Sequence, residues 1–148
     1  GGIRYLHDKS KPYFYKKLYR GLRFKDKAEC RRFMSNGHAE YEFKTTSHWT
    51  IDINTAKMFA SGVLYEDDVE GVEWQDTHDN HESSRSKLLY HGSSRGVVLE
   101  LSDVHTSRVV CDFRALPEYP RYYGGTFGQY EIILEPGNYK HETILRCP

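Results

Sequence analysis

The chain has 148 residues and a formal net charge of zero, with 38% hydrophobic, 14% aromatic and 28% charged residues. Large apolar side chains are frequent enough to bury a core, which excludes an intrinsically disordered segment. The length predicts one domain over residues 1–148. The longest apolar runs, such as 97–99, fall far short of the roughly 18 residues that cross a bilayer, so we expect no membrane partner.

The charges are unevenly distributed along the chain. Residues 1–32 hold 11 basic and 3 acidic side chains, so this segment carries a formal charge of +8 and the remainder −8. A basic segment can bind the phosphates of a nucleotide or a nucleic acid, but it can equally be a solvated face that acidic neighbours balance. The composition alone leaves both interpretations open.

The three cysteines, Cys30, Cys111 and Cys147, are widely spaced and odd in number. This pattern suits a reducing compartment better than a disulfide scaffold. The N-terminal residues contain no apolar signal-peptide core. We therefore expect three free thiols and a cytoplasmic site of action.

Residue patterns in the first half of the chain predict alternating strands and short helices. Dense aromatic and aliphatic residues indicate a buried strand, and regular alternation of polar and apolar residues indicates a half-buried one. Asp26 and Glu29 form a capping box, which is typical of a helix start. In chain order the predicted elements are a strand over 17–24, a helix from Asp26 to Asn36, a strand over 40–47 with Tyr41, Phe43, Thr45 and Ser47 on one side, and a helix capped by Asn54 that ends near Gly62.

The second half begins with an acidic stretch. Between Glu66 and Glu82 there are eight acidic residues and no Lys or Arg, which predicts an exposed loop or mobile insertion at about residues 66–86. The strands predicted after it cover 96–101, 109–113, 130–134 and 141–145, with a loop rich in Pro and Gly between the second and the third. Helices do not regularly separate the strands, so we expect an α+β fold rather than a doubly wound parallel sheet.

Several common motifs are absent from the sequence. It contains no G-x-S-x-G, no P-loop, no H-E-x-x-H and no C-x-x-C pair. His78 and His81 lie near carboxylates but lack a convincing third ligand, so we expect no metal site. The glycines at 124, 125 and 128 do not lie between a strand and a helix, which indicates turns rather than a dinucleotide-binding fingerprint.

Three short segments could carry chemistry. Tyr19-Arg20-Gly21 places an arginine on an early strand, and its guanidinium can bond two oxygens of a diphosphate at once. The run 45–50, Thr-Thr-Ser-His-Trp-Thr, ends a strand with small hydroxyls and leads into a helix. The glycine-rich run 124–137 delivers Gln129 and Glu131 to one face at a strand start. Each segment alone is a weak signal.

In this order the three segments resemble the arginine, serine and glutamate strands of the mono-ADP-ribosyltransferase toxins. The resemblance covers most of the chain from Leu18 to Tyr139. The run 128–136, Gly-Gln-Tyr-Glu-Ile-Ile-Leu-Glu-Pro, is similar to the Gln-x-Glu branch of that family, which includes enzymes that modify an asparagine of Rho GTPases and enzymes that modify guanine. The resemblance implies two packed β-sheets around an NAD-binding cleft, with short helices on the outside.

The resemblance also implies a role for each candidate residue. As catalytic residues, Glu131 would hydrogen-bond the ribose 2′-OH and stabilise the oxocarbenium-like state, Gln129 would orient the nucleophile, and Arg20 would hold a phosphate of NAD. Gln129 would contact the target, and Tyr123 and Phe127 in the preceding turn would either contact it too or pack the loop onto the body of the domain. Neither a metal nor a further cofactor is implied. The residues expected to bind the NAD co-substrate are Tyr19, Arg20, Gly21, Ser47, His48, Trp49 and Thr50.

The serine segment departs from the family pattern. In the family, the Ser-Thr-Ser element precedes a helical alanine by a fixed distance, and counting back from Ala56 gives His48-Trp49-Thr50 rather than a run that begins at Ser47. The spacing therefore favours His48, whereas strand alternation favours Ser47 and puts it on the apolar face. Either side chain can hydrogen-bond a ribose hydroxyl, so both stay candidates.

The function implied by the resemblance is a toxin or effector domain that transfers ADP-ribose from NAD to a macromolecular acceptor and releases nicotinamide. Gln129 carries no charge to engage a guanidinium, which disfavours arginine acceptors and favours another protein side chain or a nucleobase. The balanced net charge slightly favours protein over nucleic acid. Delivery within a larger toxin and a neutralising partner protein are compatible with this function. The alternatives are an NAD glycohydrolase on the same fold and a non-catalytic module that binds phosphates or nucleic acid.

Overall fold

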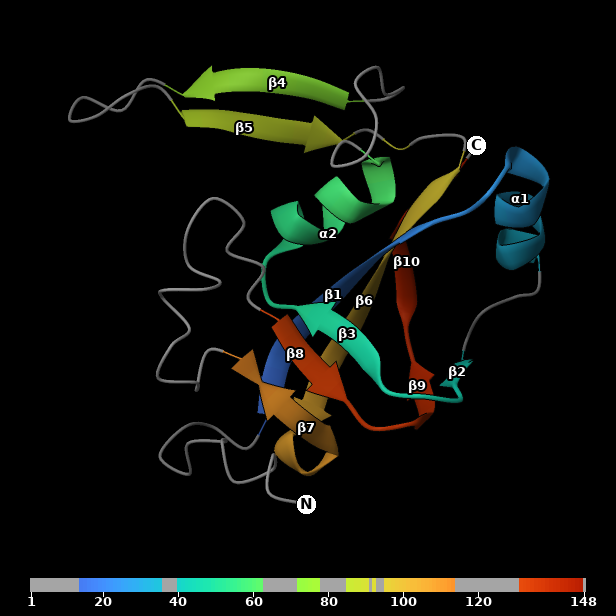
Figure 1. Cartoon of the computed structure of the whole chain (residues 1–148), viewed down its shortest axis with the longest axis vertical. Helices are drawn as coiled ribbons and strands as arrows, with labels where there is room; N and C mark the ends of the chain where they lie inside the picture. Colours follow the sequence, from blue (N-terminus) through green and yellow to red (C-terminus); the bar gives the residue numbers. More distant parts are fainter. Residues whose placement is uncertain are drawn as a thin grey trace.

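Antiparallel strands dominate the structure (Figure 1). The computed structural model describes residues 14–35, 40–62, 72–77, 85–90, 92, 95–113 and 131–147. Its elements in chain order are β1 (Phe14–Arg23), α1 (Lys27–Ser35), β2 (Glu40–Phe43), β3 (Ser47–Thr50), α2 (Ile53–Ser61), β4 (Val72–Thr77), β5 (Arg85–Tyr90), β6 (Gly96–His105), a 3₁₀ turn (Thr106–Arg108), β7 (Val109–Asp112), β8 (Glu131–Leu134), β9 (Gly137–Lys140) and β10 (Glu142–Leu145).

Six of these strands form one sheet in the order β10-β6-β1-β3-β8-β7, and every neighbouring pair in it is antiparallel. The pairs β2-β9 and β4-β5 form separate two-stranded sheets. The α+β class predicted from the sequence is confirmed. The described residues show no second large sheet packed on the first.

The two faces of β1 pack against different partners. Leu18 and its cross-strand neighbour Leu101 belong to the larger core, which also contains residues of α1 and of the β2-β9 pair. On the opposite face, a Cβ added at Gly21 would lie 1.9 Å from the carbonyl oxygen of Ala56 in α2. Only a residue without a side chain allows this approach, so Gly21 fixes α2 closely against β1.

The larger core consists mainly of aliphatic and aromatic side chains from the sheet. Among its aromatic residues, Phe43 has its ring centre 5.6 Å from that of Trp49 and 6.0 Å from that of Tyr139. The edge-on contact with Trp49, a residue of β3, attaches the β2-β9 pair to the six-stranded sheet. The buried members are Leu18, Cys30, Phe33, Phe43, Trp49, Val97, Leu99, Leu101, Val104, Val109, Ile132, Leu134, Tyr139 and Cys147.

Helix α1 begins with one of the two hydrogen bonds of the predicted capping box, and the returning bond of Glu29 is shifted by one residue to Lys25. The backbone N–H of Glu29 donates to the Asp26 carboxylate at 2.9 Å, and the Glu29 carboxylate accepts from the backbone N–H of Lys25 at 3.2 Å. The Asp26 carboxylate thereby satisfies a backbone N–H that the first turn leaves unpaired, and that of Glu29 holds the chain just before the helix.

A disulfide joins Cys30 in α1 to Cys147 near the C-terminal end, while Cys111 is free and buried. The prediction of three free thiols is therefore wrong for Cys30 and Cys147. Their spacing in the sequence could not reveal the pairing, because the fold brings together residues 117 positions apart. Disulfides persist in oxidising surroundings, so this one argues against the reducing compartment expected from the cysteine pattern.

The strand predicted over 40–47 is two strands in different sheets. β2 ends at Phe43 and pairs with β9, and β3 begins at Ser47 and pairs with β8. Phe43 and Ser47 are both buried, whereas the three residues between them are exposed. The expectation that Thr45 shares their side is wrong, because the chain bends where the alternating pattern continues.

Two further strand pairings differ from the sequence-based prediction. β4 lies inside the acidic stretch, where a loop was expected, and it pairs with β5 beyond α2 (Figure 1). β9 was not predicted and supplies the partner of β2. The loop rich in Pro and Gly lies outside the described residues. His78 and His81, which belong to the acidic stretch, lie outside them as well. None of the described helices is long and apolar enough to cross a membrane.

Candidate functional site

A pocket of about 340 Å³ opens where β1, β3, β8 and the first turns of α2 meet. It brings together parts of all three segments singled out in the sequence. Its lining residues are Tyr19, Arg20, Gly21, His48, Trp49, Thr50, Thr55, Ala56, Phe59 and Glu131. Only Thr55, Ala56 and Phe59 of these were not candidates.

The pocket lies at a seam in the six-stranded sheet. β1 pairs with β6 through nine residue pairs, but it pairs with β3 through Tyr19 and Thr50 only. Figure 1 shows β3 and β8 running in a different direction from β1 and β6. The two groups of strands diverge from this single pair, which leaves space between them for the pocket.

The register of β3 and β8 determines which side chains face the pocket. Thr50 pairs with Glu131 and His48 pairs with Ile133, so His48, Thr50 and Glu131 lie on one face of the ladder. The Nδ1 atom of His48 contacts the carboxylate of Glu131 in a hydrogen bond. The His48 side chain is 57% exposed and that of Glu131 19%. The carboxylate is thus held at the pocket wall by an imidazole at its mouth.

Ser47 lies on the other face of β3. It is 1% exposed, and its hydroxyl accepts a hydrogen bond from Nε1 of Trp49 at 2.8 Å. The prediction that Ser47 belongs to the apolar face is confirmed, and this burial keeps it out of the pocket. Of the two candidates for the serine position, His48 is the one that lines the pocket.

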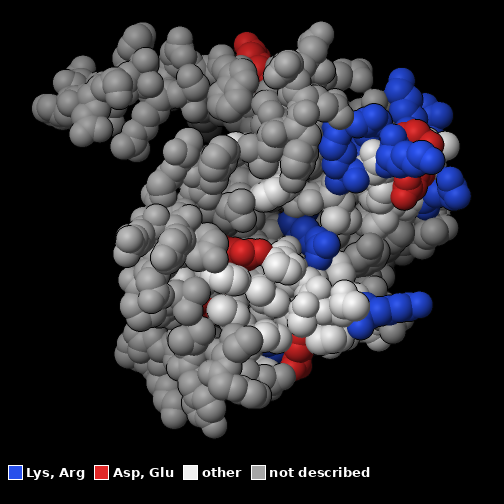
Figure 2. Space-filling view, viewed as in Figure 1, with Lys and Arg blue, Asp and Glu red and all other residues white. Residues whose placement is uncertain are grey.

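Arg20 brings a positive charge to the pocket from β1. Its guanidinium carbon lies 5.1 Å from the centre of the Phe43 ring, a cation–π contact that restricts the side chain. Figure 2 shows acidic and basic groups near the middle of this face, with uncharged residues around them. The pocket therefore has charges of both signs in its lining, from Arg20 and Glu131.

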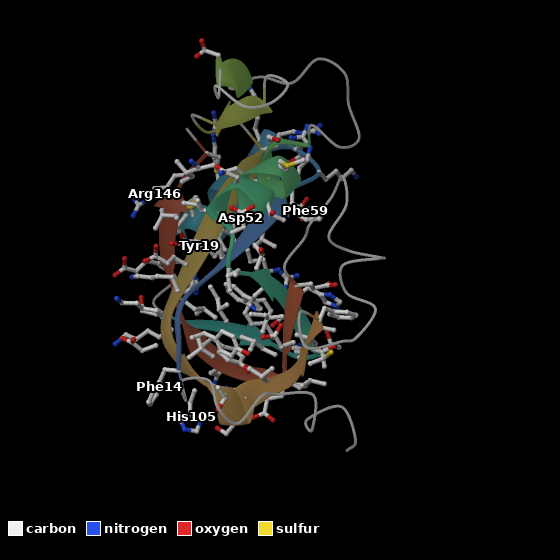
Figure 3. All side chains as sticks on the ribbon, turned by 90° about the vertical axis from the view of Figure 1, so that its left-hand side faces the viewer. Phe14, Tyr19, Asp52, Phe59, His105 and Arg146 are labelled. Atoms are coloured by element: carbon white, nitrogen blue, oxygen red, sulfur yellow. A yellow bond between two sulfur atoms is a disulfide. The ribbon has the colours of Figure 1, made fainter. Side chains whose placement is uncertain are left out.

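The start of α2 forms the remaining wall. Asp52, not Asn54 as predicted, caps the helix: its carboxylate accepts from the backbone N–H of Asn54 at 3.1 Å and from the hydroxyl of Thr55 at 2.9 Å. The hydroxyl of Thr50 accepts from the backbone N–H of Asp52 at 3.0 Å, which turns the chain sharply from β3 into α2. In Figure 3, Asp52 lies between Tyr19 and Phe59.

Thr55 and Phe59 were missed as site residues because a helix that follows a strand can turn any of its faces to the sheet. The sequence does contain a signal for these two residues: they are four positions apart, which places them on one side of the helix. The other part of the signal is Gly21, whose close approach to Ala56 determines which side faces β1.

Cys111 is the free thiol among the described cysteines. Burial, with smaller contributions from the charges of Asp112 and Glu131, raises the pKa of this thiol above its ordinary value of 9.0. A thiol is nucleophilic as the thiolate, so Cys111 is unreactive at neutral pH.

Three candidate residues, Tyr123, Phe127 and Gln129, lie outside the described residues, and their contact with a target stays a prediction. Within the described ranges, no group of three or more His, Cys, Asp or Glu side chains could hold a metal ion.

The described lining suits a particular kind of ligand. Arg20 can pair with an anionic group, the His48–Glu131 pair can engage hydroxyls or a developing positive charge, and the ring of Phe59 offers an apolar surface. A molecule that combines a phosphate, a sugar and a flat ring has all three features. No family model, curated protein or solved structure matches the chain, so the chemistry of the site rests on its own residues.

Proposed function

We propose that this domain is a mono-ADP-ribosyltransferase that uses NAD as its co-substrate. The observation that carries the proposal is the meeting of Arg20, His48 and Glu131 in one pocket. These residues come from the three segments that resemble the family's arginine, serine and glutamate strands. If the three short segments resembled the family only by chance, there would be no reason for their residues to line the same pocket.

The pocket fits part of an NAD molecule. Its volume of about 340 Å³ lies at the lower end of the range for small-molecule sites, roughly 300–1,000 Å³. It therefore accommodates the nicotinamide ribose and the adjacent phosphate, with the rest of the dinucleotide extending outside. Arg20 would hold the diphosphate, and His48 and Glu131 would engage the ribose.

In the proposed reaction, the bond between ribose C1′ and the nicotinamide nitrogen breaks, and its electron pair leaves with nicotinamide. Positive charge then builds on the ribose, as in glycoside cleavage, and the Glu131 carboxylate stabilises it. The acceptor forms the new bond to C1′ and loses a proton. Gln129 would orient this acceptor, which we take to be a non-arginine protein side chain or, less favoured, a nucleobase.

The proposal extends to the fold and the site of action. We take β10-β6-β1 and β3-β8-β7 as the counterparts of the family's two sheets, with the seam between β1 and β3 as the cleft. The enzyme would act in the cytosol after delivery. Folding in an oxidising compartment before delivery would account for the disulfide between Cys30 and Cys147.

Incubation with labelled NAD and a cell lysate tests the proposal. The unmodified domain should label a macromolecule, and Glu131→Gln should lower the rate by about 10²-fold or more, because a charge-stabilising group is lost. Glu142→Gln is the matched control, since it makes the same change on an exposed carboxylate of β10. Near-normal transfer by a folded Glu131→Gln protein would contradict the assignment.

An NAD glycohydrolase is the second candidate function. The exposure of His48 beside Glu131 favours it, because water can reach the carboxylate directly. The same assay separates the two enzymes: a glycohydrolase releases free ADP-ribose without labelling a polymer. A non-catalytic phosphate-binding module would give no turnover.

A further inference from the structure

A second hollow, of about 470 Å³, lies beside the disulfide. The described residues that line it are Arg31, Met34, Ser35, Arg146 and Cys147. It shares no lining residue with the candidate active site. In Figure 3, Arg146 and the active-site residue Phe59 lie on opposite sides of the view. The hollow is therefore a separate feature of the surface.

The disulfide brings two arginines to this hollow. Arg31 follows Cys30 directly in α1, and Arg146 directly precedes Cys147 at the other end of the chain. Joining the two cysteines therefore brings together two guanidinium groups that are 115 positions apart in the sequence.

The charge at the hollow is not balanced by the described residues. Arg31 and Arg146 are exposed, and neither forms an ion pair with a described carboxylate. Asp26, just before α1, and Glu29 in its first turn accept hydrogen bonds from backbone N–H groups at the start of the helix. Figure 2 shows basic side chains gathered over α1, with fewer acidic side chains among them. Two like charges lining one hollow repel each other, and a bound anion would remove this repulsion.

We propose that this hollow binds the phosphate group of a nucleotide or nucleic-acid strand, with Arg31 and Arg146 as its two arms. Arginine is suited to phosphate because its planar fork donates two parallel hydrogen bonds. Half-buried Met34 and the disulfide sulfur of Cys147 provide an apolar floor, which favours a phosphate ester over inorganic phosphate. The site is independent of the proposed transferase activity.

Binding of two probes tests this site, a short labelled oligodeoxycytidylate and cytidine monophosphate, at one fixed salt concentration. The double variant Arg31→Gln/Arg146→Gln should bind about tenfold or more weakly, since charged hydrogen bonds are lost. The matched control is Lys44→Gln/Lys140→Gln, which removes the same charge from exposed residues elsewhere and should change binding only slightly. Equal losses in the two double variants, or no binding of either probe, would overturn the proposal.

The two probes also identify the source of the phosphate. Stronger binding of the oligonucleotide than of the monophosphate assigns a nucleic-acid backbone, and equal binding per phosphate assigns a free nucleotide. Because both arginines would hold one phosphate, each single variant should lose almost as much affinity as the double variant. Strictly additive losses would indicate independent surface charges and would also overturn the proposal.

Reduction of the disulfide is the second arm of the test. Reduced protein that stays folded by circular dichroism should bind about as weakly as the double arginine variant, because Arg146 is no longer held beside Arg31. The double variant itself should not respond to reductant. Unchanged affinity after complete reduction would contradict the role given to the disulfide. If the reduced protein unfolds, the binding of the Arg31 and Arg146 variants in the oxidised state tests the phosphate site on its own.

Discussion

At the scale of single residues, the contact between His48 and Glu131 is the feature with the clearest chemical consequence. An imidazole that holds the carboxylate limits its freedom to turn away from the ribose of the proposed co-substrate. We expect His48→Ala to lower NAD turnover by up to about 10²-fold, because small displacements of a catalytic group have effects of this size. Stability should change little, since His48 is exposed.

His48→Asn provides the matched comparison for this prediction. Its amide can donate a hydrogen bond from near the position of Nδ1, so it should restore part of the turnover. Steady-state kinetics with NAD and thermal unfolding of each variant make the measurement. Full turnover in His48→Ala would show that Glu131 needs no positioning partner.

The candidate residues could be found from the sequence only as far as local pattern reaches. Arg20 and Glu131 were found from short motifs, and both line the pocket. The choice between Ser47 and His48 could not be made, because it depends on where β3 begins after the bend at 44–46. A shift of one residue in a strand moves every side chain to the opposite face.

At the scale of elements, the cap of α2 couples helix stability to the shape of the pocket. Asp52→Ala removes the hydrogen bonds to the backbone of Asn54 and to the hydroxyl of Thr55. We expect a loss of about 1 kcal/mol in the free energy of unfolding, within the usual span of roughly 0.5–2 kcal/mol for such caps. Urea denaturation provides the measurement.

Asn54→Ala is the control for the cap, because Asn54 contributes its backbone rather than its side chain to the capping hydrogen bonds. This change should alter the stability much less than Asp52→Ala. Asp52→Ser should preserve most of the stability, since a serine hydroxyl also accepts from the first turn. A larger loss for Asn54→Ala than for Asp52→Ala would reverse the assignment of the cap.

Elements with strong local signals were predicted, and those defined by distant partners were not. Both helices and the strands β1, β6, β7, β8 and β10 have recognisable residue patterns. β9 follows Pro136 and begins at Gly137, residues that indicate a turn, and it is a strand because β2 pairs with it. The β4-β5 pair was missed because β4 lies in an acidic stretch, whose composition says little about pairing, and β5 forms its ladder with β4.

At the scale of the whole molecule, the disulfide closes almost the entire chain into one loop. Its cysteines are 117 positions apart, so the bond restricts the unfolded chain strongly. We expect reduction to lower the free energy of unfolding by about 2–4 kcal/mol, the usual range for such a bond. Urea unfolding with and without a phosphine reductant provides the measurement.

Cys111→Ser supplies the control, since it removes the free thiol and leaves the disulfide intact. Its stability should show the same dependence on reductant as that of the unmodified chain. Coincident unfolding curves in oxidised and reduced protein would show that the bond restrains little. The order of the strands in the sheet and the pairing of Cys30 with Cys147 both depend on residues far apart in the sequence. Composition and spacing could therefore predict the fold class, but not the strand order or the disulfide.

The single residue pair between β1 and β3 has a mechanical consequence. Tyr19 and Thr50 join two three-stranded units, in each of which every neighbouring pair of strands shares at least three residue pairs. Gly21 lets α2 pack closely against one unit, whereas the pocket wall that bears His48 and Glu131 belongs to the other unit. The angle between the two units is therefore set by one bridge and by the packing of the shared core, not by a continuous ladder, and the width of the pocket depends on that packing.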